Sequence, residues 1–145
     1  MKTILKSEMR LDRLQQLFHS EGCEAQLLGN SLAPQDSYLR VDFPEPPPLI
    51  VWFDDLHLRM RVLVASNEER DQLDFELLNE DALGVNQNIE YFGTLNPGGL
   101  TGITIDYRLP CSQGILEATV MQAAKEMVQG GANYRKMLNF FCRKK

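Results

Sequence analysis

The sequence has little of what secretion, membrane insertion or a disulfide framework requires. It contains three cysteines, Cys23, Cys111 and Cys142, with no short spacing between any two of them. An odd set of scattered cysteines cannot form a disulfide framework without leaving a free thiol, so we expect partly buried thiols in a reducing compartment. The first six residues lack the apolar core of a signal peptide, and no apolar run approaches the ~20 residues that span a bilayer. These absences predict a cytoplasmic protein without membrane insertion.

Positive charge is also scarce. Lysine and arginine total 15 against 20 aspartates and glutamates, which gives a formal net charge of -5. Nucleic acids and anionic membranes are bound by clustered lysines and arginines, so we expect neither as a partner. The hydrophobic content of 43% and the charged content of 24% are ordinary for a globular protein. The length predicts one domain, residues 1–145, with a core that needs no metal or disulfide.

Motifs for catalysis and metal binding are missing as well. His19 and His57 stand in unrelated contexts, and no HExxH or CxxC spacing supplies the three or four ligands of a zinc site. Neither Cys23 nor Cys111 shows an activating histidine or an oxyanion hole. Residues 93–99 contain glycines but lack the Lys-Ser/Thr pair of a phosphate loop. We therefore predict no enzyme activity, no cofactor and no metal; an enzyme whose site depends on a cleft is the remaining alternative.

Three segments have the apolar periodicity of helices. The first is predicted over residues 7–21, with Ser7 as N-cap and Gly22 as the stop, and its apolar stripe is Leu11, Leu14, Leu17 and Phe18. The second is predicted over residues 67–83, with Asn67 as N-cap and acidic residues in its first turn.

The third helix is predicted to begin near Ser112. Its apolar stripe consists of Leu116, Val120, Ala123, Met127, Gly131, Tyr134, Leu138 and Phe141. Within that stripe, Gly130 and Gly131 are expected to kink or end the helix, because two glycines cost about 2 kcal/mol relative to alanine.

Alternating or continuous apolar runs predict the strands. Leu39, Val41 and Phe43 alternate with charged residues, and a proline run at 44–48 follows them. The runs 49–53 and 58–64 are predicted to form an antiparallel hairpin. Two more strands, 88–95 and 100–109, are joined by a turn at 96–99. The order helix, strands, helix, two strands, long helix predicts an α+β fold with an antiparallel sheet of about five strands and helices packed on one face.

Trp52 is the only tryptophan and lies within the apolar run 49–53, next to the proline run 44–48. A core position fits this pattern. An exposed aromatic anchor fits it too, since tryptophan is enriched at interface hot spots. In the second case the prolines would protect the neighbouring edge from indiscriminate pairing.

The order of these elements resembles the type III secretion chaperone superfamily, of the Tir-chaperone kind. The resemblance begins with an amphipathic helix that ends in Ser20-Glu21-Gly22-Cys23. It continues through strands around 38–43, 49–53 and 58–64, a helix over 73–83, the hairpin through Gly98-Gly99 and a closing helix that contains Tyr134.

This resemblance implies an acidic homodimer without enzymatic activity that holds an extended segment of a secreted effector on apolar surfaces. The implied partner contacts are Leu14, Leu17 and Phe18 on the first helix, and Leu39, Val41, Phe43, Ile50 and Trp52 on the sheet. The implied dimer surface is Leu73, Leu77 and Leu78. A regulatory or stress-associated domain of the same fold that binds a folded protein is the alternative.

Overall fold

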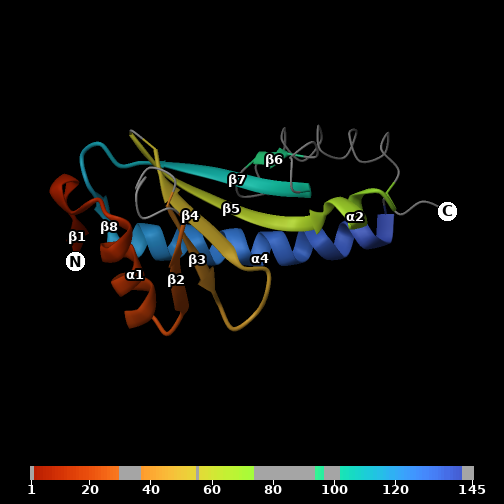
Figure 1. Cartoon of the computed structure of the whole chain (residues 1–145), viewed down its shortest axis with the longest axis horizontal. Coiled ribbons are helices and arrows are strands. Elements are labelled where there is room, and N and C mark those ends of the chain that lie inside the picture. Colours follow the sequence, from red (N-terminus) through yellow and green to blue (C-terminus); the bar gives the residue numbers. More distant parts are fainter. Residues whose placement is uncertain (1, 30–36, 55, 74–93, 97–101, 142–145) are drawn as a thin grey trace.

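The computed structural model describes residues 2–29, 37–54, 56–73, 94–96 and 102–141 (Figure 1). Its elements, in chain order, are β1 (Thr3–Ile4), a 3₁₀ turn (Lys6–Glu8), α1 (Leu11–Ser20), β2 (Glu24–Leu28), β3 (Tyr38–Asp42), β4 (Leu49–Phe53), β5 (His57–Ser66), α2 (Asn67–Arg70), β6 (Thr94–Asn96), β7 (Gly102–Pro110), β8 (Ile115–Leu116) and α4 (Glu117–Phe141).

The main sheet is antiparallel and has the strand order β2-β3-β4-β5-β7-β6. The predicted α+β class is therefore confirmed, including the hairpin of β4 with β5. The sheet has six strands rather than about five, because residues 24–28 form a strand that the sequence patterns did not predict. A separate two-stranded ribbon pairs β1 with β8.

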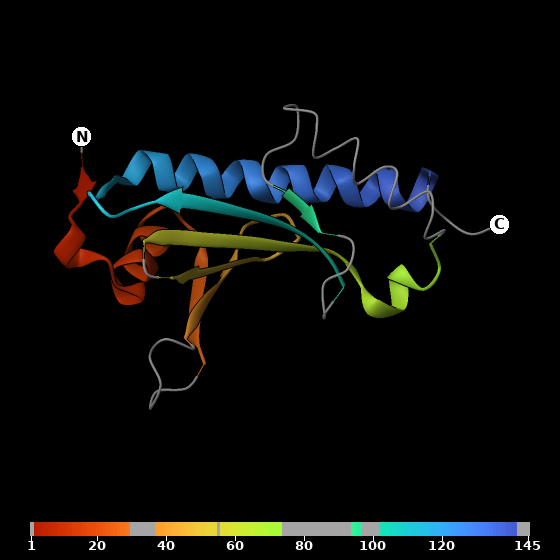
Figure 2. The same ribbon diagram turned by 90° about the horizontal axis from the view of Figure 1, so that it is seen from above.

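The core lies on one face of this sheet. Buried residues of neighbouring strands are register partners, as in the pair Leu39 and Val51 and in the pair Val51 and Met60. Helix α1 packs against β2 and β3, and α4 packs mainly against β5. Figure 2 shows α4 running alongside β5 and β7 for most of its length. In the described part of the chain, both long helices thus cover the same face, which we call the inner face.

Helix α1 begins at Leu11 rather than at Ser7. Its N-cap is Arg10, and residues 6–8 form a separate 3₁₀ turn in which the Glu8 carboxylate accepts the N–H of Leu5 at 3.0 Å. The predicted stop is confirmed, since the helix ends at Ser20 and Gly22 has a left-handed φ of 83°.

The N-cap of α2 is Ser66 and not the predicted Asn67. Strand β5 continues as far as Ser66, whose Oγ accepts the N–H of Glu69 at 3.2 Å, while the Glu69 carboxylate accepts the N–H of Ser66 at 3.1 Å. These reciprocal bonds form a capping box, which outweighs the asparagine one residue later. Helix α2 ends at Arg70, so residues 71–73 of the predicted helix are not helical. The rest of that helix, from residue 74, lies outside the described residues, as do residues 88–93 and 97–101 of the predicted second hairpin.

Helix α4 begins at Glu117 rather than near Ser112, because Ile115 and Leu116 pair with β1. It also continues through Gly130 and Gly131, which were expected to kink or end it. A Cβ at Gly131 would lie 2.8 Å from Val62 Cγ2, so this glycine permits close packing of the helix on β5. Within the described residues, no helix combines the length and the hydropathy that crossing a membrane requires.

Candidate functional site

Most of the implied partner contacts lie in the chain's own core. Five of these side chains are buried: Leu14, Leu17, Phe18, Leu39 and Val41. A side chain that packs inside its own fold offers no surface to a partner, so these five are corrected to core residues. The reason is that apolar periodicity marks any buried face and does not distinguish a core from a binding surface.

The remaining implied residues have different positions. Phe43, Ile50 and Trp52 are partly exposed, and Phe43 packs edge-on against Phe18 with 6.4 Å between the ring centroids. Leu73, of the implied dimer surface, is only 4% exposed and belongs to the core. Leu77 and Leu78 lie outside the described residues.

Trp52 is neither a fully buried core residue nor a fully exposed aromatic anchor. It lies half-buried on the outer face of the sheet, between Arg59 and Arg61, whose guanidinium carbons are 5.6 and 5.1 Å from the ring centroid. Arg59 donates to Asp54 at 2.9 Å, and Arg61 donates to both carboxylate oxygens of Asp106 at 2.6 and 3.3 Å. The ring is thus held by two cation–π contacts whose arginines are themselves paired.

An apolar groove lies at the β2 edge of the sheet, beside the start of α1. This α1–β2 groove has a volume of about 550 Å³ and is lined by Met9, Arg10, Leu11, Asp12, Leu27, Ser37 and Phe53. Leu27 is 47% exposed, although it lies on the core-facing side of its strand as the register partner of the buried Leu39. Met9, Leu11 and Phe53 are partly buried against the core. The groove therefore continues the core out to the molecular surface.

Helix α1 and strand β2 are tied together next to this groove. Gln15 donates to the Ala25 carbonyl at 2.9 Å, and His19 Nε2 lies 3.1 Å from the same oxygen. Sequence reasoning missed Leu27 because residues 24–28 were not predicted as a strand. The available signal was the alternation of Ala25 and Leu27 with Glu24 and Gln26.

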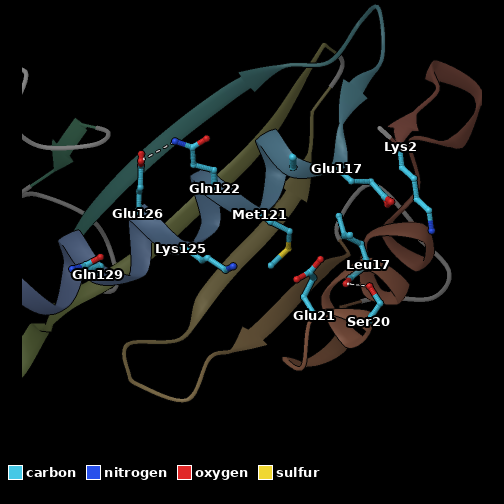
Figure 3. A pocket seen from close by; sticks show the side chains of 11 residues that line it. Lys2, Leu17, Ser20, Glu21, Glu117, Met121, Gln122, Lys125, Glu126 and Gln129 are labelled. Atoms are coloured by element: carbon cyan, nitrogen blue, oxygen red, sulfur yellow. Dashed lines mark hydrogen bonds between the residues drawn. The ribbon is translucent and has the colours of Figure 1, made fainter.

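A second groove separates α1 from the first half of α4 (Figure 3). It has a volume of about 760 Å³ and is lined by Lys2, Leu17, Ser20, Glu21, Glu117, Ala118, Met121, Gln122, Lys125, Glu126 and Gln129. Leu17 and Met121 are nearly buried, and Glu117 is paired with Arg13 at 3.2 Å. Because most of its lining residues are charged or polar, this groove is more polar than the α1–β2 groove.

No protein-family model matches this chain, and no curated protein matches it in sequence. The two grooves and the outer sheet face are therefore interpreted from their own chemistry.

Two buried thiols and one histidine–carboxylate pair lie among the described residues. Burial raises the pKa of both Cys23 and Cys111 above the ordinary value of 9.0, so these thiols are protonated at neutral pH. His57 Nδ1 lies 3.5 Å from Asp54. Burial opposes ionisation of Asp54, but hydrogen bonds from Arg59 and from two backbone N–H groups lower its pKa below the ordinary value. Among the described residues, no three potential ligands converge on a metal position.

Proposed function

We propose that this chain is a protein-binding domain that holds an extended segment of a partner in the α1–β2 groove. The observation that carries this proposal is the exposed apolar side chain of Leu27 on β2, a strand that pairs only with β3 in the described sheet. An extended segment can place apolar side chains in such a groove while its main chain pairs with an edge strand.

The energetics of this mode are favourable for an unfolded segment. Burying one leucine-sized side chain contributes about 1.5–3 kcal/mol, and the groove offers contacts from Met9, Leu11 and Phe53 as well as Leu27. Two or three anchors therefore offset much of the cost of ordering a short segment. The exposed ion pair of Arg10 with Asp12, at 3.2 Å, forms a polar rim beside the apolar lining.

A finer proposal concerns the kind of partner. The order of elements supports a chaperone of the type III secretion kind, in which the bound segment belongs to a secreted effector. The antiparallel sheet and the closing helix α4 agree with the fold that this proposal needs. A regulatory domain that binds a folded protein is the competing outcome, and it predicts no affinity for unfolded chains.

The test uses a permanently unfolded probe, a reduced and carboxymethylated model protein carrying a fluorescent label. We expect the full chain to bind it, and Leu27→Ser to weaken binding about tenfold or more, since one buried leucine is lost from the complex. Leu56→Ser is the matched control, because Leu56 is 57% exposed, lies in the β4–β5 turn and is not among the residues that line the groove. Hydrogen exchange should show new protection at β2 in the complex.

Both substitutions affect exposed leucines, so both variants should keep the thermal midpoint of the parent. Equal affinities of the Leu27→Ser and Leu56→Ser variants would contradict the proposal. Absence of binding to the unfolded probe would contradict it too.

A further inference from the structure

The basic residues of the described six-stranded sheet all lie on its outer face. They are four arginines: Arg40 on β3, Arg59 and Arg61 on β5, and Arg108 on β7. Strand β5 points Leu58, Met60 and Val62 into the core, so the alternating Arg59 and Arg61 point away from it. In the described part of the chain, α1 and α4 leave this face uncovered.

Two of these arginines are direct cross-strand neighbours. Arg59 on β5 is the register partner of Arg108 on β7, and Trp52 on β4 is the register partner of Arg59. Like charges directly opposite one another destabilise a sheet. Asp54 neutralises Arg59, and Asp106 neutralises Arg61. Arg108 is exposed and forms no ion pair with any residue that the structure describes, so within that part of the chain its positive charge is not cancelled.

The two arginines meet at a hollow where β6 lies beside β7. This hollow has a volume of about 570 Å³ and is lined by Arg59, Leu95, Asn96, Asp106, Tyr107 and Arg108. Arg59 Nε is a buried donor without an acceptor among the described residues. An anion in the open hollow does not reach this buried atom, but a carboxylate between the two guanidinium groups would reduce the repulsion of the like charges.

We propose that the hollow between Arg59 and Arg108 binds the carboxylate of an aspartate or glutamate in an acidic polypeptide segment that crosses the outer face. The uncancelled charge matches a singly charged carboxylate better than a doubly charged phosphate. Arginine forks bind carboxylates in a bidentate manner. Ile50 and Trp52 lie on the same face and are partly exposed, which supplies apolar contacts for a polypeptide. Its two arginines lie on the opposite face from the α1–β2 groove, and the site does not depend on the function proposed above.

Trp52 provides the readout, because it is the only tryptophan and Arg59 lies against its ring. The full chain is titrated with a peptide of alternating glutamate and valine, and tryptophan emission is followed. We expect saturable binding that weakens with added salt, and at least about tenfold weaker binding of the glutamine–valine counterpart. Inorganic phosphate and acetate are titrated separately as free anions.

Arg108→Gln is expected to weaken binding of the glutamate peptide by at least about tenfold. The matched control is Arg40→Gln on the same face, since Arg40 is paired with Asp42 of its own strand at 3.4 Å. That variant should bind within about twofold of the parent. The thermal midpoint of the Arg108→Gln variant should equal or exceed that of the parent, because a like-charge contact is removed.

The proposal is overturned if the two peptides bind equally, if Arg108→Gln binds like the parent, or if the glutamate peptide does not bind. A phosphate site would replace this proposal under two conditions. Phosphate would displace the peptide at a lower concentration than acetate does, and it would bind more tightly than the peptide. None of these results alters the outcome expected for Leu27→Ser.

Discussion

At the scale of single residues, the two adjacent glycines of α4 have opposite surroundings. A Cβ added to Gly130 meets no atom within 4 Å, whereas one added to Gly131 would lie 2.8 Å from Val62 Cγ2 and 3.3 Å from Pro47 Cγ. The sequence pattern treats both glycines as helix-weakening residues. Only their packing distinguishes a replaceable glycine from a required one.

The first prediction follows from this contrast. Gly130→Ala should raise the free energy of unfolding by about 0.5–1 kcal/mol, because alanine has the higher helix propensity and reduces the entropy of the unfolded chain. Gly131→Ala should lower it by about 1–3 kcal/mol, because overpacking against Val62 exceeds the helix gain. Chemical denaturation of both variants measures the difference. A stabilised Gly131→Ala variant would show that β5 and α4 do not approach this closely.

At the scale of elements, the end of strand β5 determines which residue caps α2, because β5 ends at Ser66 and Ser66 is the N-cap. The Glu69 carboxylate accepts the N–H of Ser66 and also pairs with Arg135 of α4 at 2.7 Å. The hydrogen bond from the Ser66 backbone and the charge of Arg135 lower the pKa of Glu69 below its ordinary value. Partial burial raises this pKa, but by less. The cap therefore links β5, α2 and α4 through one carboxylate.

The second prediction tests this cap. Ser66→Ala should cost about 1 kcal/mol of stability at neutral pH, and Asn67→Ala should cost less, since Ser66 and not Asn67 is the N-cap. A lowered folded-state pKa stabilises the fold above the ordinary pKa of glutamate, and this stabilisation is lost as the pH falls through the lower value. The difference in free energy of unfolding between the parent and the Glu69→Gln variant should therefore become smaller below about pH 4. The opposite order of the serine and asparagine variants would refute the assignment of the cap.

Elements with a clear local pattern of apolar residues or a local stop residue could be predicted from the sequence. Elements whose bounds depend on pairing with distant residues could not. Strands β4 and β5 have strong apolar patterns, and the left-handed Gly22 ends α1 where expected. The start of α4 could not be predicted, because Ile115 and Leu116 are withdrawn from the helix by pairing with β1. The site was predictable only in part: apolar helix and strand faces were found, but Leu27 and the pairing of Arg59 with Arg108 arise from sheet order and register.

At the scale of the whole molecule, stability is concentrated where layers meet. Strand β5 pairs on both sides, with β4 and β7, and also supports α4 on the inner face. By contrast, β1 and β8 form a ribbon of two residues each, outside the main sheet. A residue with hydrogen-bonded neighbours on both sides and a helix above it opens only when much of the fold opens.

The third prediction is a gradient of amide hydrogen exchange. The slowest amides should lie in β5, followed by those of β4, β7 and the buried side of α4. Amides of the β1–β8 ribbon and of α2 should exchange faster, by local opening. Native-state exchange measured residue by residue by NMR provides the comparison. Equal protection of the ribbon and of β5 would mean that the chain opens as one unit, contrary to this gradient.

The β1–β8 ribbon also has a consequence for the order of events during synthesis. Residues 3–4 leave the ribosome long before residues 115–116, so β1 has no partner while the meander from β2 to β5 can pair strand by strand as it emerges. The ribbon closes only once β8 has been made, at the point where α4 begins. A closed ribbon therefore marks a chain in which the connection from the sheet to the last helix is already in place. A translating chain that stalls before this point keeps its first strand unpaired.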